Sequence, residues 1–366
     1  MNVFTEMKDL GHERVLLCCN PQAGLQAVIA IHNTVLGPGL GGTRMWPYES
    51  FDAAITDALR LSRGMTYKAA AAGINLGGAK AVIVGDPKKD KSEALFRAFG
   101  RFVDTLGGHY ITAEDVGTST SDMEWIATET PWVTGVPPEL GGGGDPSPVT
   151  ALGVLQGIRA SAQELWGSPD LTGRHVSIQG LGSVGGYLAR YLREEGARIT
   201  GTDIDAAAIA AARDSGVEIV EPNAIYDVEC DIFAPCALGA ILNDETLPRL
   251  KVRAVAGGAN NQLADPARHG AEIERRGILY APDFVINAGG LINVFQEFIG
   301  YDQERALRRA RGIFESVLRV YDIAKRHKEP TAVAADRLAE ERISAVTALG
   351  PRHWDRAVLD RLASAH

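Results

Sequence analysis

Two lysines and one aspartate stand out because each lies next to a strongly apolar segment. Lys68 precedes four alanines, Lys80 follows two glycines and opens the run Ala81–Val84, and Asp115 ends another apolar segment. Burial in such company lowers the pKa of a lysine, and a shift of about two to three units costs about 3–4 kcal/mol. A lysine shifted that far can act as a base near neutral pH. For Asp115, a proton-transfer role and a turn- or helix-capping role are both open on local grounds.

A glycine-rich turn later in the chain has the spacing of a dinucleotide site. The apolar run Val176–Ile178 leads into Gly180-Leu181-Gly182-Ser183-Val184-Gly185-Gly186, and a helical pattern follows. Gly180 permits a tight turn, Gly182 lets the backbone approach a pyrophosphate, and Gly185 lets the helix pack on the strand. The free N–H groups of the helix N-terminus favour phosphate. We therefore expect a bound dinucleotide here.

The acidic residue after the next predicted strand indicates which dinucleotide. Asp203 ends the run Arg198–Thr202, about twenty residues beyond the first glycine. A carboxylate there accepts hydrogen bonds from the ribose hydroxyls and repels a 2′-phosphate. Asp205 adds negative charge, whereas Arg213 opposes it. The pattern predicts NAD in preference to NADP.

Short elements of alternating type must position the lysines and Asp115. The pattern predicts a hairpin over 15–36, a glycine-dense turn at 37–44, helices over 50–68 and 92–105, and strands over 81–84 and 110–113. Ser50 suits a helix N-cap. Gly141–Pro148, with four glycines and two prolines, reads as a linker or hinge between domains.

The second half alternates strands and helices in the manner of a doubly wound parallel sheet. After a helix over 149–166, strands are expected at 176–178, 198–202, 231–234, 252–256 and 277–280, and tail helices at 302–328 and 332–349. The fold class is α/β with two domains, each with a central sheet flanked by helices. We expect a substrate, catalytic and oligomerisation domain over 1–145, joined by a C-terminal helix at about 330–366. An NAD-binding domain of Rossmann type is expected over 146–329.

Composition excludes several classes of function. The chain of 366 residues has a formal net charge of −9, which argues against nucleic-acid and membrane-surface binding. The four cysteines and eight histidines form no zinc or HExxH spacing, so we expect no metal site. Residues 69–85 are apolar but contain Lys80 and are too short to span a bilayer. With no apolar signal segment at the start, a cytoplasmic protein is expected.

The motifs so far, with several others, resemble those of one enzyme family over nearly the whole chain. They are Leu40-Gly41-Gly42-Thr43-Arg44, Met65–Lys68, Asn75–Lys80, Ala113–Gly117, Asp145–Thr150, Ala259–Gln262 and Asn287–Gly290. In this order they resemble the amino-acid dehydrogenases that act on glutamate, leucine, valine and phenylalanine. Within the family, the resemblance is greatest to the leucine dehydrogenase branch.

The resemblance implies NAD-dependent, reversible oxidative deamination of an L-amino acid to a 2-oxo acid and ammonia. By that analogy Lys80 activates water, Asp115 exchanges protons with the amino group, and Lys68 pairs with the substrate carboxylate. Further substrate contacts are expected from Leu40, Gly41, Gly42, Met65, Ala113, Asn261, Leu291 and Val294. Cofactor contacts are expected from Gly180–Gly186, Asp203, Thr150, Asn260 and Asn287. The resemblance also implies a homo-oligomer, with an octamer as one form.

The side-chain pocket is expected to be apolar. Glutamate-specific relatives carry a lysine and a serine where this chain has Leu40 and Val294, and an apolar pocket does not compensate a buried carboxylate. We therefore expect leucine, valine and isoleucine as substrates; phenylalanine or valine specificity within the family is the alternative. A hydroxy-acid dehydrogenase and a non-catalytic NAD-binding protein are the readings from other classes. The first would need a catalytic histidine–carboxylate pair, for which the sequence offers no clear candidate.

Overall fold

A computed structural model describes residues 2–350 of the chain. The chain forms two compact units and passes from one to the other four times. The first unit contains Met1–Gly144, Val294–Gln303 and Ala339–His366, and the second contains Asp145–Asn293 and Glu304–Leu338. The short return of residues 294–303 to the first unit has no counterpart in the domain ranges expected from sequence. The roles assigned to the two units remain predictions.

The first unit is built on a mixed six-stranded sheet in the order β1-β2-β5-β3-β6, with β4 paired to β5. The strands are β1 (Arg14–Asn20), β2 (Leu25–Asn33), β3 (Gly39–Leu40), β4 (Thr43–Trp46), β5 (Gly77–Val84) and β6 (Tyr110–Ile111). β1, β2 and β5 are antiparallel, whereas β3 and β4 run parallel to β5. β5 is thus the strand on which the rest of this sheet converges.

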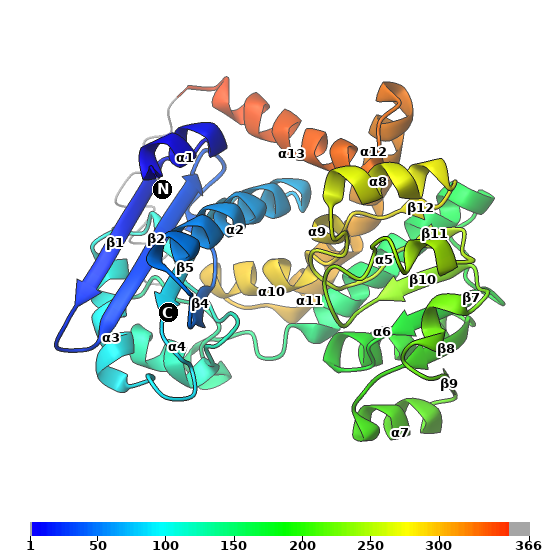
Figure 1. Cartoon of the computed structure of the whole chain (residues 1–366), viewed down its shortest axis with the longest axis horizontal. Helices are drawn as coiled ribbons and strands as arrows, with labels where there is room; N and C mark the ends of the chain where they lie inside the picture. The colour runs from blue at the N-terminus through cyan, green and yellow to red at the C-terminus, as the bar shows by residue number, and fades with distance from the viewer. Residues whose placement is uncertain (1, 351–366) are drawn as a thin grey trace. The chain divides into compact units, whose positions relative to one another are not determined.

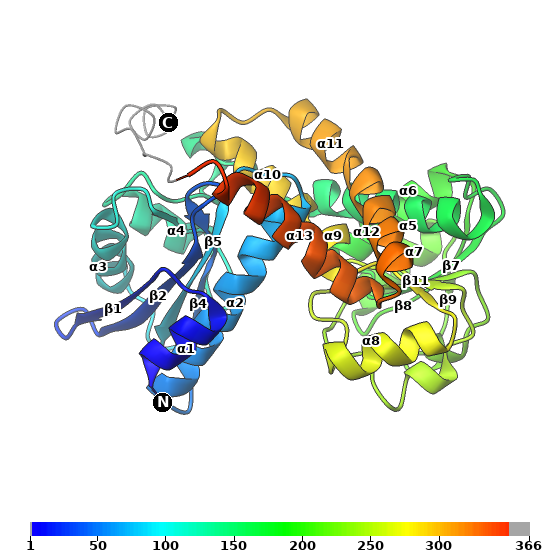
Figure 2. The ribbon, with the colours of Figure 1, turned by 90° about the horizontal axis from the view of Figure 1, so that it is seen from above.

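Helices cover both faces of this sheet. α1 (Val3–Leu10) and α2 (Phe51–Ala71) lie on one face, and α3 (Glu93–Asp104) and α4 (Thr120–Ala127) on the other (Figures 1 and 2). α2 begins where expected, because the Ser50 hydroxyl accepts the Ala53 N–H at 3.2 Å. Ile55 and Leu59 of α2 are buried against Val28 and Val82 of the sheet. Burial of each such side chain contributes about 1.5–3 kcal/mol, which fixes α2 on β5.

The second unit contains a six-stranded sheet that is parallel throughout, in the order β12-β11-β10-β7-β8-β9. Its strands are β7 (His175–Gln179), β8 (Arg198–Thr202), β9 (Glu218–Ile219), β10 (Ile232–Pro235), β11 (Ala254–Val255) and β12 (Leu279–Tyr280). Counted in chain order within this sheet, the strands lie 3-2-1-4-5-6, which is the dinucleotide-binding order. The two-domain α/β prediction is therefore confirmed, with a doubly wound sheet in the second unit.

The helices of the second unit surround its sheet. They are α5 (Ser147–Trp166), α6 (Ser183–Glu194), α7 (Ala206–Asp214), α8 (Pro266–Arg275) and α9 (Asp283–Ile286), with α11 (Gln303–Arg311) and α12 (Ile313–His327) from the tail. α6 packs against α5, β7 and β8, and α12 packs against α5 and α9. α10 (Gly289–Phe298) and α13 (Thr331–Thr347) each contribute residues to both units.

The tail differs from its sequence prediction in one respect. A single helix over 302–328 was expected, but the structure has α11 (Gln303–Arg311) and α12 (Ile313–His327), interrupted at Gly312. Glycine in a helix interior costs about 1 kcal/mol relative to alanine, so a break there is inexpensive. The expected helix over 332–349 is α13. In the part of the chain that the structure describes, no helix is long and apolar enough to cross a membrane.

Candidate active site

Lys80 lies in the middle of β5 and is almost completely buried. β2 flanks it through the pairing of Lys80 with Ala30, and only 6% of the lysine side chain is exposed. Its Nζ lies 2.9 Å from Oδ2 of Asp115. The structure thus brings together the two residues to which sequence analysis gave proton-transfer roles.

Asp115 is held beside Lys80 by the segment that follows β6. The N–H groups of Thr43 and Met45 donate to the carbonyls of Ala113 (2.8 Å) and Val116 (2.9 Å), so β4 brackets the aspartate on both sides. A Cβ on Gly42 would lie 2.8 Å from the Cβ of Asp115, so only glycine permits this approach. Gly42 of the motif therefore allows the Asp115 carboxylate to take this position.

The electrostatic surroundings favour a proton acceptor at each position. Burial lowers the pKa of Lys80 below its ordinary value, although Asp115 acts in the opposite direction. Burial alone would raise the pKa of Asp115, but the charges of Lys80 and then Arg44 outweigh it, and that pKa lies below its ordinary value. Asp115 is thus favoured as an ionised carboxylate, and burial shifts Lys80 towards its neutral amine form.

A second cation, Arg44, contacts the same Asp115 oxygen, and sequence analysis gave it no role. Nε of Arg44, on β4, donates to Oδ2 of Asp115 at 3.1 Å, and its Nη1 donates to Oδ2 of Asp57 at 2.9 Å. The Tyr48 hydroxyl donates to the same Asp57 oxygen through a short hydrogen bond. Arg44 stood inside the motif that carried the resemblance, so its type was the available signal. No sequence signal pointed to Asp57, because it lies on a helix 13 residues from Arg44 in sequence.

The expected substrate contacts of the first unit surround the same region of β5. Lys68 and Met65 lie half-buried in the last turns of α2. A Cβ on Gly78 would lie 2.1 Å from the backbone nitrogen of Thr66, so this end of α2 rests directly on β5. Leu40 and Ala113 are buried, and Gly41 and Gly42 are buried beside them in the chain. Lys68 and Lys80 thus occupy elements in direct contact.

The glycine turn of the second unit has the form that a pyrophosphate requires. It connects β7 to α6; Gly180 has φ +94°, and a Cβ on Gly185 would lie 1.9 Å from the Gly180 carbonyl oxygen. Nothing lies within 4 Å of a Cβ built on Gly182, so the space above the turn is open. Gly182, Ser183 and Gly186 are exposed, whereas Leu181 and Gly185 are buried.

Asp203 lies directly after β8 and closes the same turn. Its Oδ2 accepts the Leu181 N–H at 2.6 Å, and its Oδ1 accepts the N–H groups of Ile204 (2.7 Å) and Asp205 (2.9 Å). Burial acts to raise the pKa of Asp203, but these backbone donors outweigh it and lower that pKa. The carboxylate is therefore ionised and fixed in place, with lone pairs left for ribose hydroxyls.

Asn287 presents an unsatisfied acceptor. Its Nδ2 donates to Oδ1 of Asn260 at 2.7 Å and to the Gly258 carbonyl at 3.2 Å, whereas its buried Oδ1 has no hydrogen-bond partner among residues 2–350. A buried acceptor without a partner costs about 1–3 kcal/mol, so a ligand amide that donates to it would be bound favourably. Asn261 is exposed and has a positive φ of 51°, and Thr150 lies in the first turn of α5. These positions fit a nicotinamide group.

Two further residues on α10 were expected to contact substrate. Leu291 belongs to the second unit and is buried. Val294 is half-buried and is the first residue of the segment that returns to the first unit. Sequence analysis missed Glu297 on the same helix. Its carboxylate is buried and accepts the N–H groups of Gly135 (2.8 Å) and Gly143 (2.9 Å). A lone acidic residue in an apolar helix was the signal.

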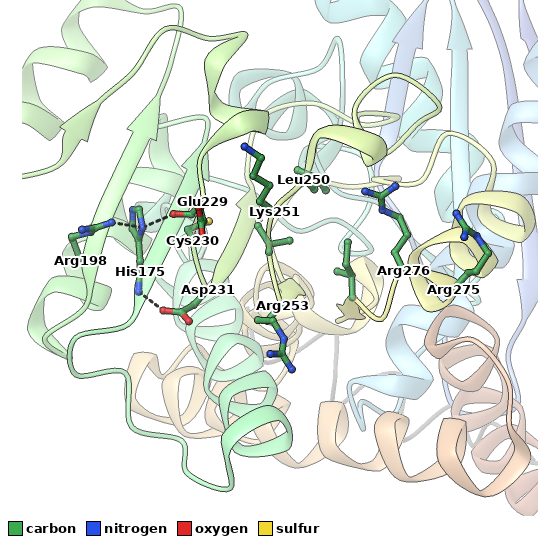
Figure 3. Close-up of a pocket in the computed structure, with 12 residues that line it drawn as sticks. His175, Arg198, Glu229, Cys230, Asp231, Leu250, Lys251, Arg253, Arg275 and Arg276 are labelled. Carbon is green, nitrogen blue, oxygen red and sulfur yellow. Dashed lines mark hydrogen bonds between the residues drawn. The ribbon is translucent and has the colours of Figure 1, made fainter.

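A hollow of about 1010 Å³ in the second unit lies apart from these residues. It lies at the amino-terminal edge of the parallel sheet, lined by His175, Arg198, Asp231 and Arg253 among others, and Figure 3 shows Arg198 directed at His175. Dinucleotides bind at the carboxyl edge of such sheets. Because no residue of the glycine turn lines this hollow, we do not assign the cofactor to it.

Comparisons with known proteins match the chain to two family models. Residues 12–132 match the family described as Glu/Leu/Phe/Val dehydrogenase, dimerisation domain. Residues 141–219 and 205–348 match the family described as Glutamate/Leucine/Phenylalanine/Valine dehydrogenase.

Individual relatives cover almost the whole chain. A leucine dehydrogenase of Geobacillus stearothermophilus is 57% identical over 94% of both chains. The crystal structure of an L-tryptophan dehydrogenase from Nostoc punctiforme is 45% identical, with a TM-score of 0.87, over 94% of this chain and 99% of that one. A hetero-hexameric glutamate dehydrogenase from Thermus thermophilus is 25% identical, with a TM-score of 0.75, over 95% of this chain and 92% of that one.

Proposed function

The chain belongs to the Glu/Leu/Phe/Val dehydrogenase family, and from that premise we propose that it oxidises branched-chain L-amino acids with NAD. The products are the 2-oxo acid and ammonia, and the reaction is reversible. The observation that carries the proposal is the buried contact of 2.9 Å between Lys80 and Asp115. In a chain 57% identical to a leucine dehydrogenase, this pair provides the two proton acceptors that deamination needs.

Enzymes of this family use a nicotinamide cofactor, and we propose NAD as the one used here. Gly180–Gly186 and the N-terminus of α6 would hold the pyrophosphate, and Asp203 would accept the ribose hydroxyls. The unsatisfied Oδ1 of Asn287 would accept the carboxamide N–H of the nicotinamide. Asn260, which is hydrogen-bonded to Asn287, and Thr150 would also belong to this site. When bound, NAD supplies the two-electron oxidation of the substrate Cα.

The chain's own residues handle charge and protons. Lys68 would pair with the substrate α-carboxylate and so orient the molecule. Oxidation at Cα requires a neutral amine, so Asp115, ionised beside Lys80 and Arg44, would accept a proton from the substrate ammonium. The resulting iminium must be attacked by water, and neutral Lys80 would remove a proton from that water. Asn261 would contact the substrate.

The side-chain preference follows from the residues proposed to surround it. Leu40, Ala113, Leu291 and Val294 are all apolar, and together with Met65 they offer no partner for a distal carboxylate. Each substrate methylene is worth about 1–3 kcal/mol, so leucine, valine and isoleucine should be accepted together, whereas glutamate should not.

Aromatic substrates form the second candidate. The similarity to an L-tryptophan dehydrogenase, at 45% identity, supports this alternative. We propose a homo-oligomer in either case, with an octamer as one form; the Thermus thermophilus relative is also multimeric, as a hetero-hexamer. Light scattering coupled to gel filtration gives the mass directly.

A substrate panel tests the proposal. Reduction of NAD is followed at 340 nm with leucine, valine, isoleucine, phenylalanine, tryptophan and glutamate, and kcat/KM is compared. We expect the three branched substrates to exceed the aromatic ones and glutamate by at least about tenfold, the value of one methylene contact. A panel led by phenylalanine or tryptophan would move the chain to the aromatic branch, and one led by glutamate would refute the pocket assignment. Val333→Ala, an exposed change on α13, is a matched control.

A further inference from the structure

Both cations beside Asp115 contact the same carboxylate oxygen. Lys80 Nζ lies 2.9 Å and Arg44 Nε 3.1 Å from Oδ2, and no hydrogen bond to Oδ1 arises within residues 2–350. The carboxylate is therefore held by one oxygen and presents the other. Oδ1 is the atom available to a substrate amine.

Arg44 is itself held from behind. Its guanidinium spans Asp115 through Nε and Asp57 through Nη1, and the Tyr48 hydroxyl completes the coordination of Asp57. A planar guanidinium can join two carboxylates at once in a fixed geometry, which the single nitrogen of a lysine cannot do. The elements involved are β4, α2 and the segment after β6, so this network fixes the Asp115 carboxylate to the rigid part of the first unit.

Lys80 and Arg44 differ in whether they keep their positive charge during the reaction. The proposed reaction requires a neutral Lys80 in the enzyme that binds substrate, and in that state, before Asp115 takes the ammonium proton, Lys80 does not compensate the charge of Asp115. Arg44 stays protonated at any pH compatible with a folded protein. Among the groups of residues 2–350 that touch the Asp115 carboxylate, Arg44 alone supplies a charge that survives the catalytic deprotonation of Lys80.

We propose that Arg44, braced by Asp57 and Tyr48, is a positioning residue that directs Oδ1 of Asp115 to the substrate and keeps Asp115 ionised while Lys80 is neutral. The inference rests on the proposed function. The charged and titratable groups around the pair are Arg44 on β4, Asp57 on α2, Tyr48 after β4 and Tyr110 on β6. The positive charge of Arg44 also lowers the pKa of Lys80, so one residue acts on both proton acceptors in the same direction.

The test compares pH profiles of kcat/KM for the wild type, Arg44→Gln and Arg60→Gln. Arg60 lies on α2 and, with Arg44, lines a hollow of about 540 Å³ in the first unit. Within residues 2–350 it is not an ion-pair partner of Asp115, so its loss removes an equal charge nearby without touching that carboxylate. In Arg44→Gln the pKa values of Asp115 and Lys80 both rise, and the rising limb moves to higher pH by about one unit. On that limb the variant is about tenfold slower than wild type, and the deficit shrinks as pH rises.

Two more variants separate positioning from folding. Arg44→Lys restores the charge, so its limb returns close to that of wild type, although kcat stays lower because one ammonium does not span both carboxylates. Asp57→Asn removes a negative charge that raises the pKa of Lys80, so its limb moves to lower pH, the opposite direction. If Arg44 and Asp57 served only folding, their variants would have lower thermal stability, but their pH profiles would not shift in opposite directions. Superimposable profiles for wild type and Arg44→Gln, or an equal shift in Arg60→Gln, would overturn the inference.

A readout without turnover keeps this test separate from the proposed function. The fraction of Lys80 acetylated by acetic anhydride is measured against pH by mass spectrometry of its peptide. The midpoint should rise by about one unit in Arg44→Gln and stay unchanged in Arg60→Gln. If the wild type oxidises no amino acid, the proposed function fails, and this midpoint still decides the role of Arg44.

Discussion

Lys80 and Asp115 form a nearly buried ion pair, with Nζ 2.9 Å from Oδ2 and 6% and 24% of the two side chains exposed. A pair of this kind contributes little net stability, because desolvation offsets most of the attraction between the charges. Its use is therefore chemical: burial favours the neutral form of Lys80, whereas the positive charges beside Asp115 keep that carboxylate ionised.

Replacement of Lys80 by alanine should abolish most turnover and spare cofactor binding. Loss of a general base lowers kcat by about 10²–10⁴-fold, whereas the glycine turn belongs to the other unit. Steady-state rates and NADH fluorescence titrations measure the two effects. Lys89→Ala is the control, since that side chain is 79% exposed and pairs only with Asp86 at the surface. Near-normal rates in Lys80→Ala would remove this lysine from the chemistry.

Asp203→Asn should narrow the preference for NAD over NADP. The change removes the charge that repels a 2′-phosphate and weakens the hydrogen bonds to the ribose, each worth about 1.5–3 kcal/mol for a charged acceptor. We expect the ratio of kcat/KM values for NAD and NADP to fall by at least about tenfold. Asp214→Asn, an exposed change at the end of α7, should leave the ratio unaltered. An unaltered ratio in Asp203→Asn would place the ribose elsewhere.

Two histidines should make the protein sensitive to mild acid. Nε2 of His12 donates to the Leu59 carbonyl (3.0 Å) and lies 2.8 Å from Ser62 Oγ. Nε2 of His32 donates to the Leu10 carbonyl (3.0 Å), and its Nδ1 lies 2.8 Å from Thr66 Oγ1. Burial first, with nearby positive charge, lowers the pKa of each from 6.5 to about 4. The unfolded chain therefore binds more protons between these values.

The sign of this linkage fixes the pH window. Stability is complete above pH 6.5 and is lost as pH falls towards 4, by up to about 1.4 kcal/mol per pH unit for each histidine. Urea unfolding at pH 7.5 and 5.0 measures the loss. His32→Gln should reduce the pH dependence, whereas His327→Gln, on the exposed end of α12, should retain it. Equal slopes in His32→Gln and wild type would contradict the assignment.

Glu297→Gln should destabilise the first unit. The buried carboxylate accepts two N–H groups, and an amide has one oxygen to offer, so one backbone donor loses its partner at a cost of about 1–3 kcal/mol. The thermal midpoint should fall relative to wild type and to Glu139→Gln, whose side chain is exposed. Identical midpoints for Glu297→Gln and Glu139→Gln would mean that the carboxylate is dispensable.

Local patterns predicted the fold because they act over short distances. The helix after Ser50, the hairpin over 15–36 and the glycine turn at 180–186 each depend on neighbours in sequence, and each is present. The break at Gly312 was missed because the amphipathic pattern continues through it, although glycine was a visible signal. The parallel pairing of β4 with β5 was also beyond prediction, since such short strands have no periodicity of their own.

The sequence predicted which residue types form the site, but not the long-range hydrogen bonds and ion pairs that hold them. Lys80 and Asp115 were chosen from their apolar surroundings, and the structure places them in contact. The bracing of Asp115 by Arg44 joins residues 71 apart in sequence, and no local rule couples them. The same holds for Glu297, whose partners Gly135 and Gly143 precede it by 162 and 154 residues. Long-range polar pairs depend on the completed fold.

The stoichiometry of a single reaction tests the central claim most directly. Purified protein is incubated with NAD and L-leucine, and NADH, ammonia and the 2-oxo acid are quantified in the same sample. We predict that the three products appear in a 1:1:1 ratio and that omission of leucine abolishes all of them. NADH without ammonia, or no product from any branched-chain amino acid, would contradict the account.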